Sequence, residues 1–164
     1  MVITKMIYTP NLSANMAAFL EMIKFSEIGP ALLAVSDDGY NVCVGSTPEH
    51  PILFTSYATH PDIYNAQLSS TAAGAFQLLY RYYEAYKAQL NLPDFSPASQ
   101  EAIAMQQIKE RNAVEDIEAG NLAAAIAACS SIWASFPGEP YGQGANSYAS
   151  LLGAYQEAGG TVVA

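Results

Sequence analysis

A single glutamate, Glu27, is the residue of this sequence best placed for acid chemistry. It follows apolar residues at the three- and four-residue spacing of one helix face, namely Met16, Phe19, Leu20 and Ile23. Ser13 or Asn15 is placed to cap the start of this helix and Gly29-Pro30 to stop it, so Glu27 is expected in the last turn. Apolar neighbours and the negative end of the helix dipole both disfavour a charged carboxylate there.

A carboxylic acid that stays protonated near neutral pH can act as a general acid. It would be suited to protonating a poor leaving group such as a glycosidic oxygen. The alternative is a solvated glutamate at a helix end, which is the ordinary environment of this residue type. The position of Glu27 alone leaves both interpretations open.

A second stretch whose residues could bind a ligand is SSTAAGAFQLL, residues 69–79, where small side chains at 72–75 precede Gln77. Small residues let the backbone approach a ligand closely, and an amide side chain offers donors and an acceptor to sugar hydroxyl or acetamido groups. Tight packing of a helix explains the same pattern without a ligand.

The histidines and cysteines do not form a recognisable site. His50 and His60 both precede prolines in expected loops and have no third ligand at suitable spacing, so no metal site is predicted. Cys43 and Cys129 lie far apart and make no disulfide framework, so both are expected to be free and buried.

Composition limits the class of protein. The chain has 164 residues, 51% of them hydrophobic and 13% charged, which predicts one globular domain over residues 1–164. A net charge of −9 argues against nucleic-acid binding. No apolar run approaches the roughly 18 residues of a membrane span. The first residues lack the features of a secretory signal, so the chain is expected to accumulate in the cytosol.

The elements that must position these residues are mostly helical, with a short sheet after the first helix. A loop is expected after Pro30, and alternating apolar residues predict strands at 39–45 and 53–55. Periodicity and capping residues predict the later helices, over residues 70–90, 96–111, a short one ending at Gly120, one from Asn121 towards Trp133, and 147–158. The pattern indicates an α+β fold.

Several long segments together resemble the lambda lysozyme family of phage endolysins. The resemblance runs colinearly from about Phe19 to Val162 and is carried by FLEMIKFSE, GYNVCVG, STAAGAFQLL, YYEAYKAQL, DFSPASQEAIAMQQIKER, CSSIWASFPGEPYGQ and EAGGT. That family has a lysozyme-like fold and consists of lytic transglycosylases that cleave peptidoglycan. The resemblance therefore implies a lysozyme-like fold with a small antiparallel sheet, and the same activity.

The resemblance also assigns roles to residues. The glutamate of the family's Ser-Glu pair at the end of the first helix is catalytic, which implies that Glu27 is the catalytic residue here. The implied substrate-binding residues lie in the small-residue stretch and in a second long loop expected over PGEPYGQG, residues 137–144. They are Ser70, Thr71, Gln77, Tyr141, Gly142 and Gln143. The family's two lips around the cleft correspond to about 54–65 and 136–144.

The implied mechanism needs one carboxyl group. It protonates the oxygen that links N-acetylmuramic acid to N-acetylglucosamine, and then, as a carboxylate, takes the proton of the muramic 6-hydroxyl as a 1,6-anhydro end forms. A hydrolytic muramidase would need a second carboxylate, for which Asp37 and Asp38 are the candidates. Hydrolytic phage lysozymes place an aspartate or cysteine and then a threonine where this chain has Ser36 and Val42. We therefore interpret Asp37-Asp38-Gly39 as the residues of a turn before a strand.

The resemblance further implies peptidoglycan as the partner, no cofactor, a monomer, and release from the host cytoplasm to the periplasm through a holin. Two features depart from the family's pattern: the apolar segment 28–38, where the family is polar, and the acidic net charge. A glycan-binding relative with weak activity is therefore kept as another alternative.

Overall fold

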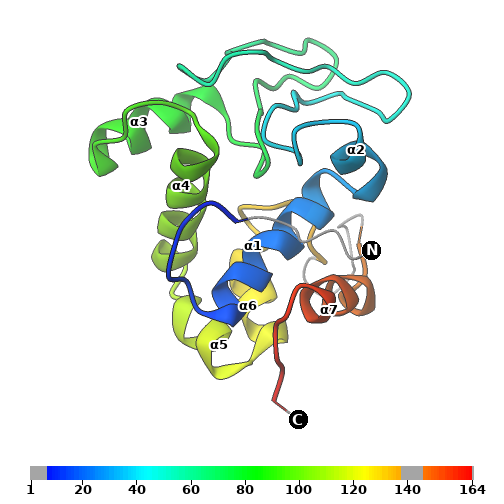
Figure 1. Ribbon diagram of the computed structural model, residues 1–164, viewed down its shortest axis with the longest axis vertical. Coiled ribbons are helices and arrows are strands. Elements are labelled where there is room, and N and C mark those ends of the chain that lie inside the picture. Colours follow the sequence, from blue (N-terminus) through cyan, green and yellow to red (C-terminus); the bar gives the residue numbers. More distant parts are fainter. Residues whose placement is uncertain (1–6, 138–145, 164) are drawn as a thin grey trace. The chain divides into compact units, whose positions relative to one another are not determined.

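The computed structural model describes residues 7–137 and 146–163, and within these ranges the chain is mostly helical (Figure 1). Its helices, in order, are α1 (Ala14–Glu27), α2 (Pro30–Ala34), α3 (Tyr80–Leu90), α4 (Pro97–Glu110), α5 (Val114–Ala119), α6 (Leu122–Cys129) and α7 (Tyr148–Glu157). The chain forms two compact units. We call residues 27–103 the central unit, and the described residues before and after them the terminal unit.

Helix α1 of the terminal unit forms where the sequence predicts it. Ser13 caps its start, because the Ser13 Oγ accepts a hydrogen bond of 3.0 Å from the Met16 N–H. The predicted apolar face is buried, with Phe19 fully inaccessible to solvent. The ring of Phe19 packs edge-on against that of Phe136, with ring centres 6.2 Å apart.

The remaining helices of the terminal unit also follow their predicted caps. Helix α5 ends at Gly120, whose φ of 82° is the left-handed conformation that favours glycine. Helix α6 packs against α5 and ends at Cys129, earlier than the expected extension towards Trp133. Helix α7 is capped by Ser147, whose Oγ accepts from the Ser150 N–H at 3.1 Å.

The central unit begins with a short helix in place of the loop expected after Pro30. Proline stands at the first position of α2, where its fixed φ suits a helix start and its missing N–H costs nothing. Gly29 precedes it with a φ of 86°, which separates α2 from α1. Leu32 and Leu33 are buried and hold this short helix in place.

The two predicted strands pair as expected but are very short. Val42 forms an antiparallel bridge with Leu53, and Cys43 forms one with Ala73. Throughout the described residues such bridges are isolated and no longer strand is present. The small antiparallel sheet of the prediction is therefore reduced to single bridges between loops.

The prediction of a helix over residues 70–90 is wrong for the first ten of these residues, which are not helical. Ala73 and Leu78 form an antiparallel bridge that closes a tight turn. Gly74 and Gln77 in this turn have φ values of 87° and 51°, which no continuous right-handed helix can contain. A Cβ on Gly74 would lie 2.4 Å from the Oε1 of Gln100. The small residues thus serve a packed turn, and α3 starts only at Tyr80.

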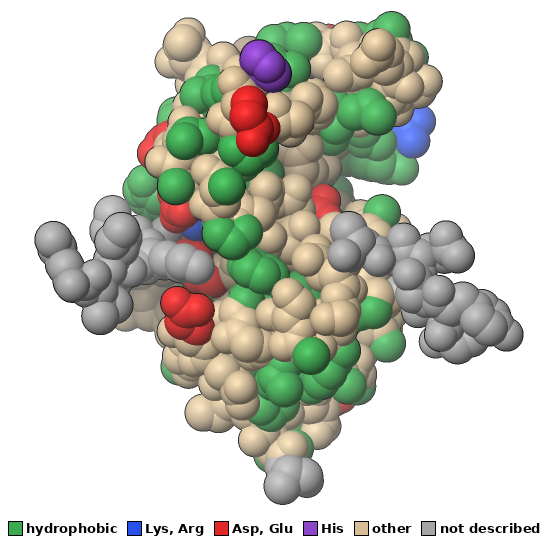
Figure 2. All heavy atoms as spheres, turned by 90° about the vertical axis from the view of Figure 1, so that its right-hand side faces the viewer, with side chains coloured by type: hydrophobic (Ala, Val, Ile, Leu, Met, Phe, Trp, Pro, Cys, Tyr) green, Lys and Arg blue, Asp and Glu red, His purple; other side chains and the backbone are tan. Residues whose placement is uncertain are grey.

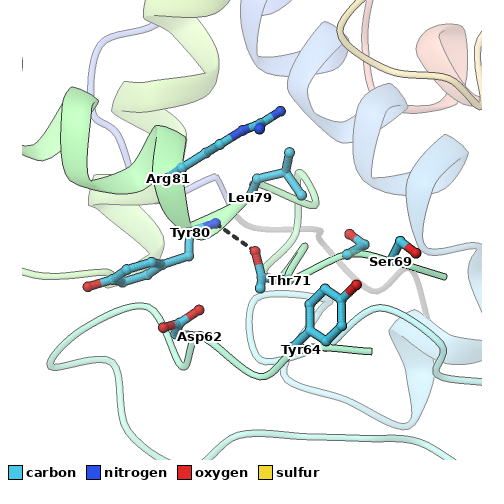
Figure 3. A pocket seen from close by; sticks show the side chains of 8 residues that line it. Asp62, Tyr64, Ser69, Thr71, Leu79, Tyr80 and Arg81 are labelled. Carbon is cyan, nitrogen blue, oxygen red and sulfur yellow. Dashed lines mark hydrogen bonds between the residues drawn. The ribbon is translucent and has the colours of Figure 1, made fainter. Parts of the chain in front are cut away.

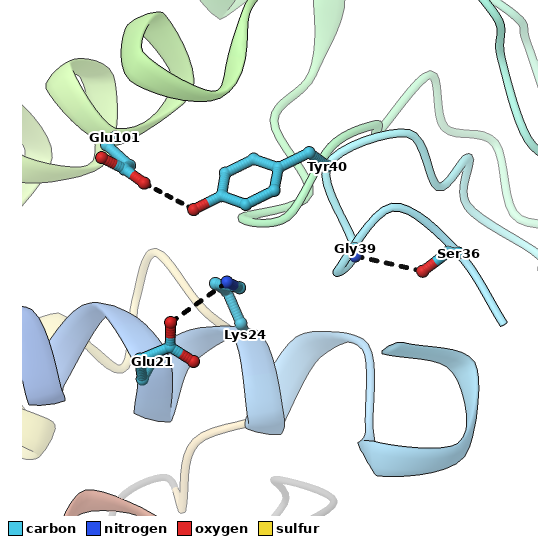
Figure 4. Close-up of polar contacts among 6 residues, drawn as sticks. All are labelled: Glu21, Lys24, Ser36, Gly39, Tyr40 and Glu101. Atoms are coloured by element: carbon cyan, nitrogen blue, oxygen red, sulfur yellow. Dashed lines mark hydrogen bonds and ion pairs between the residues drawn. The ribbon is translucent and has the colours of Figure 1, made fainter. Parts of the chain in front are cut away.

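Buried polar and aromatic side chains hold the central unit together. The Gln100 Oε1 accepts from the Ala75 N–H at 2.9 Å, and its Nε2 donates to the carbonyls of Tyr40 and Phe95 at 3.0 and 2.9 Å. The Tyr40 hydroxyl donates to the buried Glu101 carboxylate at 2.5 Å (Figure 4). These contacts tie the loops to the first part of α4.

The described surface carries few basic groups. On the face shown in Figure 2, acidic side chains lie at several places and basic ones at few, in keeping with the net charge of −9. Among the helices of the described ranges, none combines the length and the apolar character needed to cross a membrane.

Candidate active site

Glu27 is the last residue of α1, as predicted, and its side chain is half-buried. Ser26, the residue before it, is held by hydrogen bonds from two other segments. Its Oγ lies 2.7 Å from the Ser135 Oγ, and the Asn146 Nδ2 donates to both the carbonyl and the Oγ of Ser26, at 3.1 and 3.0 Å. These bonds satisfy a carbonyl at the open end of the helix and fix the backbone that carries Glu27.

One turn before Glu27, α1 carries a buried ion pair that the sequence analysis did not single out. The Lys24 Nζ lies 3.2 Å from the Glu21 Oε1, and the two side chains are 0% and 5% exposed (Figure 4). Their separation of three residues on a helix was the available signal. A cation in the last turn offsets part of the negative helix end at which Glu27 lies.

The amide nitrogen of Gln77 stabilises the turn that contains this residue. Its Nε2 donates to the carbonyls of Gly74 and Val42, at 2.8 and 3.2 Å. Both donations go to the backbone and hold the turn against the segment around Val42. The amide oxygen is the atom of Gln77 that can be offered to a ligand.

Ser70 and Thr71 line a pocket of the central unit with a volume of about 290 Å³ (Figure 3). The Thr71 Oγ1 accepts from the Tyr80 N–H at 3.0 Å, which joins the turn to the start of α3. The Ser70 Oγ accepts from the Ala72 N–H at 3.0 Å. The pocket wall comes from three segments, with the residues Asp62, Tyr64, Ser69, Ser70, Thr71, Leu79, Tyr80 and Arg81.

Tyr141, Gly142 and Gln143, the other predicted substrate-binding residues, lie outside the described residues, as does most of the second predicted lip. The first predicted lip, residues 54–65, is described, and a buried histidine anchors it. The His60 Nε2 lies 2.7 Å from the Leu78 carbonyl, and its Nδ1 accepts from the Asp62 N–H at 3.0 Å. This pattern requires the neutral tautomer with its proton on Nε2.

The environment of His60 favours the same neutral form. Its side chain is 1% exposed, and its ring lies 4.9 Å from that of Phe95, centre to centre. Burial lowers the pKa of His60 from 6.5, against the opposing effects of the Leu78 carbonyl and the Asp62 carboxylate. His60 is thus a structural residue that sequence reasoning had considered only as a metal ligand.

Asp37 and Asp38 lie in the turn before Asn41, in agreement with the turn interpretation. The Tyr57 hydroxyl donates to the Asp37 Oδ2 at 2.5 Å, and the Asp37 N–H donates to the Asn41 Oδ1 at 2.8 Å. Asp38 has a φ of 48°, a conformation that aspartate tolerates in turns.

The thiols and the acidic groups of the described ranges show no metal or redox site. Cys43 and Cys129 are both free and buried, as predicted. Burial raises the pKa of the Cys43 thiol, and raises that of Cys129 to about 12 against a small opposing effect of Arg111, which keeps both thiols protonated and unreactive. Within residues 7–137 and 146–163, no group of three or more His, Cys, Asp or Glu side chains is arranged to hold a metal ion.

Comparison with known proteins places this geometry in a family. A model of the endolysin family matches residues 17–162. The chain is 47% identical to the endolysin of Escherichia phage lambda over 149 residues, which covers 88% of this chain and 91% of the relative. It is 41% identical to the endolysin of Escherichia phage P2 over 158 residues, which covers 92% and 96%.

Solved structures give the same result. Lysozyme from bacteriophage lambda in complex with a chitohexasaccharide matches with a TM-score of 0.83 and 44% identity, covering 94% of this chain and 100% of that chain. A second structure of lysozyme from bacteriophage lambda matches with the same TM-score and coverage at 43% identity. The predicted lysozyme-like α+β fold is thereby confirmed. The chain therefore belongs to the endolysin family, as a phage enzyme with the lysozyme-like fold.

Proposed function

We propose that this endolysin cleaves the β-1,4 bond between N-acetylmuramic acid and N-acetylglucosamine of peptidoglycan without consuming water, leaving 1,6-anhydromuramic ends and causing lysis of the host. The single observation that carries the proposal is the position of Glu27 as the half-buried last residue of α1. The lambda lysozyme structure, which contains a chitohexasaccharide, supports a β-1,4-linked amino-sugar polymer as the class of ligand.

In the proposed mechanism Glu27 acts first as an acid and then as a base. Its carboxyl proton goes to the glycosidic oxygen, the bond from that oxygen to the muramic C1 breaks, and N-acetylglucosamine leaves with a free 4-hydroxyl group. The positive charge at C1 is stabilised by the N-acetyl group of the substrate. The Glu27 carboxylate then takes the proton of the muramic 6-hydroxyl as its oxygen bonds to C1, which regenerates the acid.

The arrangement around Glu27 is consistent with one residue in both roles. The bonds from Ser135 and Asn146 to Ser26 fix the backbone at the end of α1, and preorganisation of this kind is what an acid–base group needs. Asp37, a candidate second carboxylate for a hydrolase, is already bonded to the Tyr57 hydroxyl. We therefore favour the non-hydrolytic reaction over an acid–base pair that holds a water between two carboxylates.

The test is digestion of purified peptidoglycan by the wild type and by Glu27→Gln, followed by chromatography and mass spectrometry of the products. We expect 1,6-anhydro products from the wild type and a loss of rate of about a thousandfold in the variant, with an unchanged circular dichroism spectrum. Asp37→Asn and Asp38→Asn serve as matched carboxylate controls and are expected to stay active. Reducing ends that disappear in either control would indicate hydrolysis. No products from the wild type would favour a glycan-binding relative.

We also propose that Gln77, Ser70, Thr71, Tyr141, Gly142 and Gln143 contact the glycan strand. The position of Ser70 and Thr71 on a pocket wall supports their part of this assignment. Alanine substitution of Ser70 or Tyr141 is expected to raise KM for peptidoglycan severalfold. An unchanged KM in both variants would remove these residues from the binding surface.

For the behaviour of the chain in the cell, we propose a monomer with a single domain over residues 1–164, made in the host cytoplasm and released to the periplasm by a holin. Helices α1 and α4 each contribute residues to both compact units, which supports one domain. A single unfolding transition and a monomer mass in analytical ultracentrifugation are expected. Expression without a holin should delay lysis, and prompt lysis in its absence would contradict that part.

A further inference from the structure

The pocket beside Ser70 and Thr71 has room for a side group of a glycan strand that passes over these two residues. Its volume of about 290 Å³ lies near the lower end of the range of roughly 300–1,000 Å³ that is usual for ligand pockets. It is formed within the central unit, between the loop around Asp62, the turn after Ser69 and the start of α3 (Figure 3).

Arg81 forms one edge of this pocket and brings to its rim a charge that is rare in the molecule, with the guanidinium directed away from Asp62, Tyr64 and Thr71 (Figure 3). Within residues 27–103 the sequence has two basic residues, Arg81 and Lys87, among many acidic ones. Arg81 lines the pocket and Lys87 does not. In the described part of the chain, Arg81 forms no ion pair with a carboxylate.

The guanidinium of Arg81 is also held in place. Its Cζ lies 4.9 Å from the centre of the Tyr82 ring, and its Nη2 donates to the Tyr82 hydroxyl at 3.3 Å. A stacked guanidinium loses less freedom on binding, and its remaining N–H groups match a carboxylate in bidentate geometry. The group that such a site recognises best is a carboxylate.

The other walls suit the remainder of a short peptide or sugar side group. Tyr64 is 62% exposed and presents an apolar ring to stack on the ligand. Asp62 supplies an acceptor for amide N–H or amino groups, and its backbone N–H is bonded to His60, which fixes this part of the loop. Peptidoglycan carries carboxylates, amides and amino groups on the lactyl side group of N-acetylmuramic acid, whereas the hydroxyl and acetamido groups of its glycan are neutral.

We propose that this pocket binds a carboxylate of the lactyl-peptide side group of N-acetylmuramic acid, with Arg81 as the recognising residue. The proposal rests on the proposed function, because it takes peptidoglycan as the substrate. It makes Arg81 a specificity residue that separates bacterial wall from chitin-type glycan.

Calorimetric titration tests this with three disaccharides that lack the muramic-to-glucosamine bond and so are not cleaved. They are N-acetylglucosaminyl-N-acetylmuramic acid carrying its peptide, the same disaccharide without peptide, and N,N′-diacetylchitobiose. We expect the wild type to bind the best muramyl ligand about tenfold more tightly than chitobiose. Whichever muramyl ligand is preferred identifies the carboxylate as that of the peptide or of the free lactyl group.

The variants then assign the preference to a residue. Arg81→Ala should abolish it without changing the affinity for chitobiose, Arg81→Lys should retain part of it, and Lys87→Ala, the matched control on the same helix, should retain all of it. Equal affinity of the wild type for all three ligands, or a preference that survives Arg81→Ala, would overturn the proposal. Because binding is measured without turnover, this result is independent of the digestion experiment, whose failure would overturn the proposed function.

Discussion

Both compact units of this endolysin pack aromatic rings together, as Tyr83 does against Phe95 in the central unit, but they differ in what pairs their backbone hydrogen-bonding groups. In the terminal unit, helices bury apolar side chains such as Phe19, Trp133 and Phe136, which pack ring against ring. In the central unit much of the chain between Val35 and Leu79 is turn and loop, and buried side chains such as Gln100 and His60 bond to its backbone. Loop backbone lacks the hydrogen bonds that a helix supplies internally, so side chains must supply them.

This difference predicts how each unit responds to the loss of one polar side chain. A buried backbone group left without a partner costs about 1–3 kcal/mol, whereas one that water can reach costs less. The loop-rich central unit should therefore be sensitive to single substitutions of the side chains that pair its backbone, whereas the terminal unit should tolerate the loss of hydrogen bonds that water can replace.

The largest effect on stability is expected for Gln100→Ala. This change removes the partners of the Ala75 N–H and of the Tyr40 and Phe95 carbonyls, at a position only 3% exposed. We expect the free energy of unfolding to fall by about 4 kcal/mol in urea titrations. Gln100→Glu keeps the shape and one acceptor but cannot donate as a carboxylate, so it should be destabilised too. A loss below about 1 kcal/mol would show that aromatic packing alone holds the unit.

A smaller effect with a distinctive pH dependence is expected at His60. Because burial lowers the pKa of His60 in the folded chain below 6.5, the unfolded chain binds more protons as the pH falls through 6.5, and stability then decreases. His60→Gln should cost about 2 kcal/mol at pH 7.5 through lost hydrogen bonds. It should also remove this decrease between pH 7.5 and 5.5.

The exposed His50 provides the control for this measurement. Thermal unfolding of His50→Gln over the same pH range should follow the wild type. A wild-type curve that is flat in this range, or one that His50→Gln flattens equally, would mean that His60 is not the titrating group.

The smallest effect is expected for Asn15→Ala in the terminal unit, which is the counterpart of Gln100→Ala. The Asn15 Nδ2 donates to the Ile117 carbonyl at 2.9 Å, and its Oδ1 accepts from the Thr161 N–H at 3.0 Å. Asn15 is half-buried, so water can replace these bonds, and we expect a loss of about 1 kcal/mol. Equal losses for Asn15→Ala and Gln100→Ala in urea titrations would remove the contrast between the units.

The sequence predicted the terminal unit better than the central one, for a physical reason. Caps at Ser13, Gly120 and Ser147 act within a few residues of the helix ends they define, so local sequence is sufficient to find them. The turn at residues 73–78 instead depends on Gln100, which is distant in the sequence. Its small and apolar residues are equally compatible with a helix when that contact is unknown.

The candidate site shows the same division. Glu27 was located because helix periodicity and the Gly29-Pro30 stop are local signals. The pocket that includes Arg81 could not be predicted, because its wall is assembled from three segments that only the fold brings together. The anchoring of Ser26 by Ser135 and Asn146 was likewise invisible to spacing rules.

That anchoring has a consequence for how such enzymes can diversify. Ser135 and Asn146 flank residues 136–145 in the sequence, and both bond to the residue before Glu27. Phe136 is buried against Phe19 of α1 and must stay, but insertions, deletions or grafted sequences after Pro137 and before Asn146 are expected to leave the end of α1 in place. Laboratory libraries aimed at a new wall chemistry should therefore keep Ser135, Phe136 and Asn146 and vary residues 138–145.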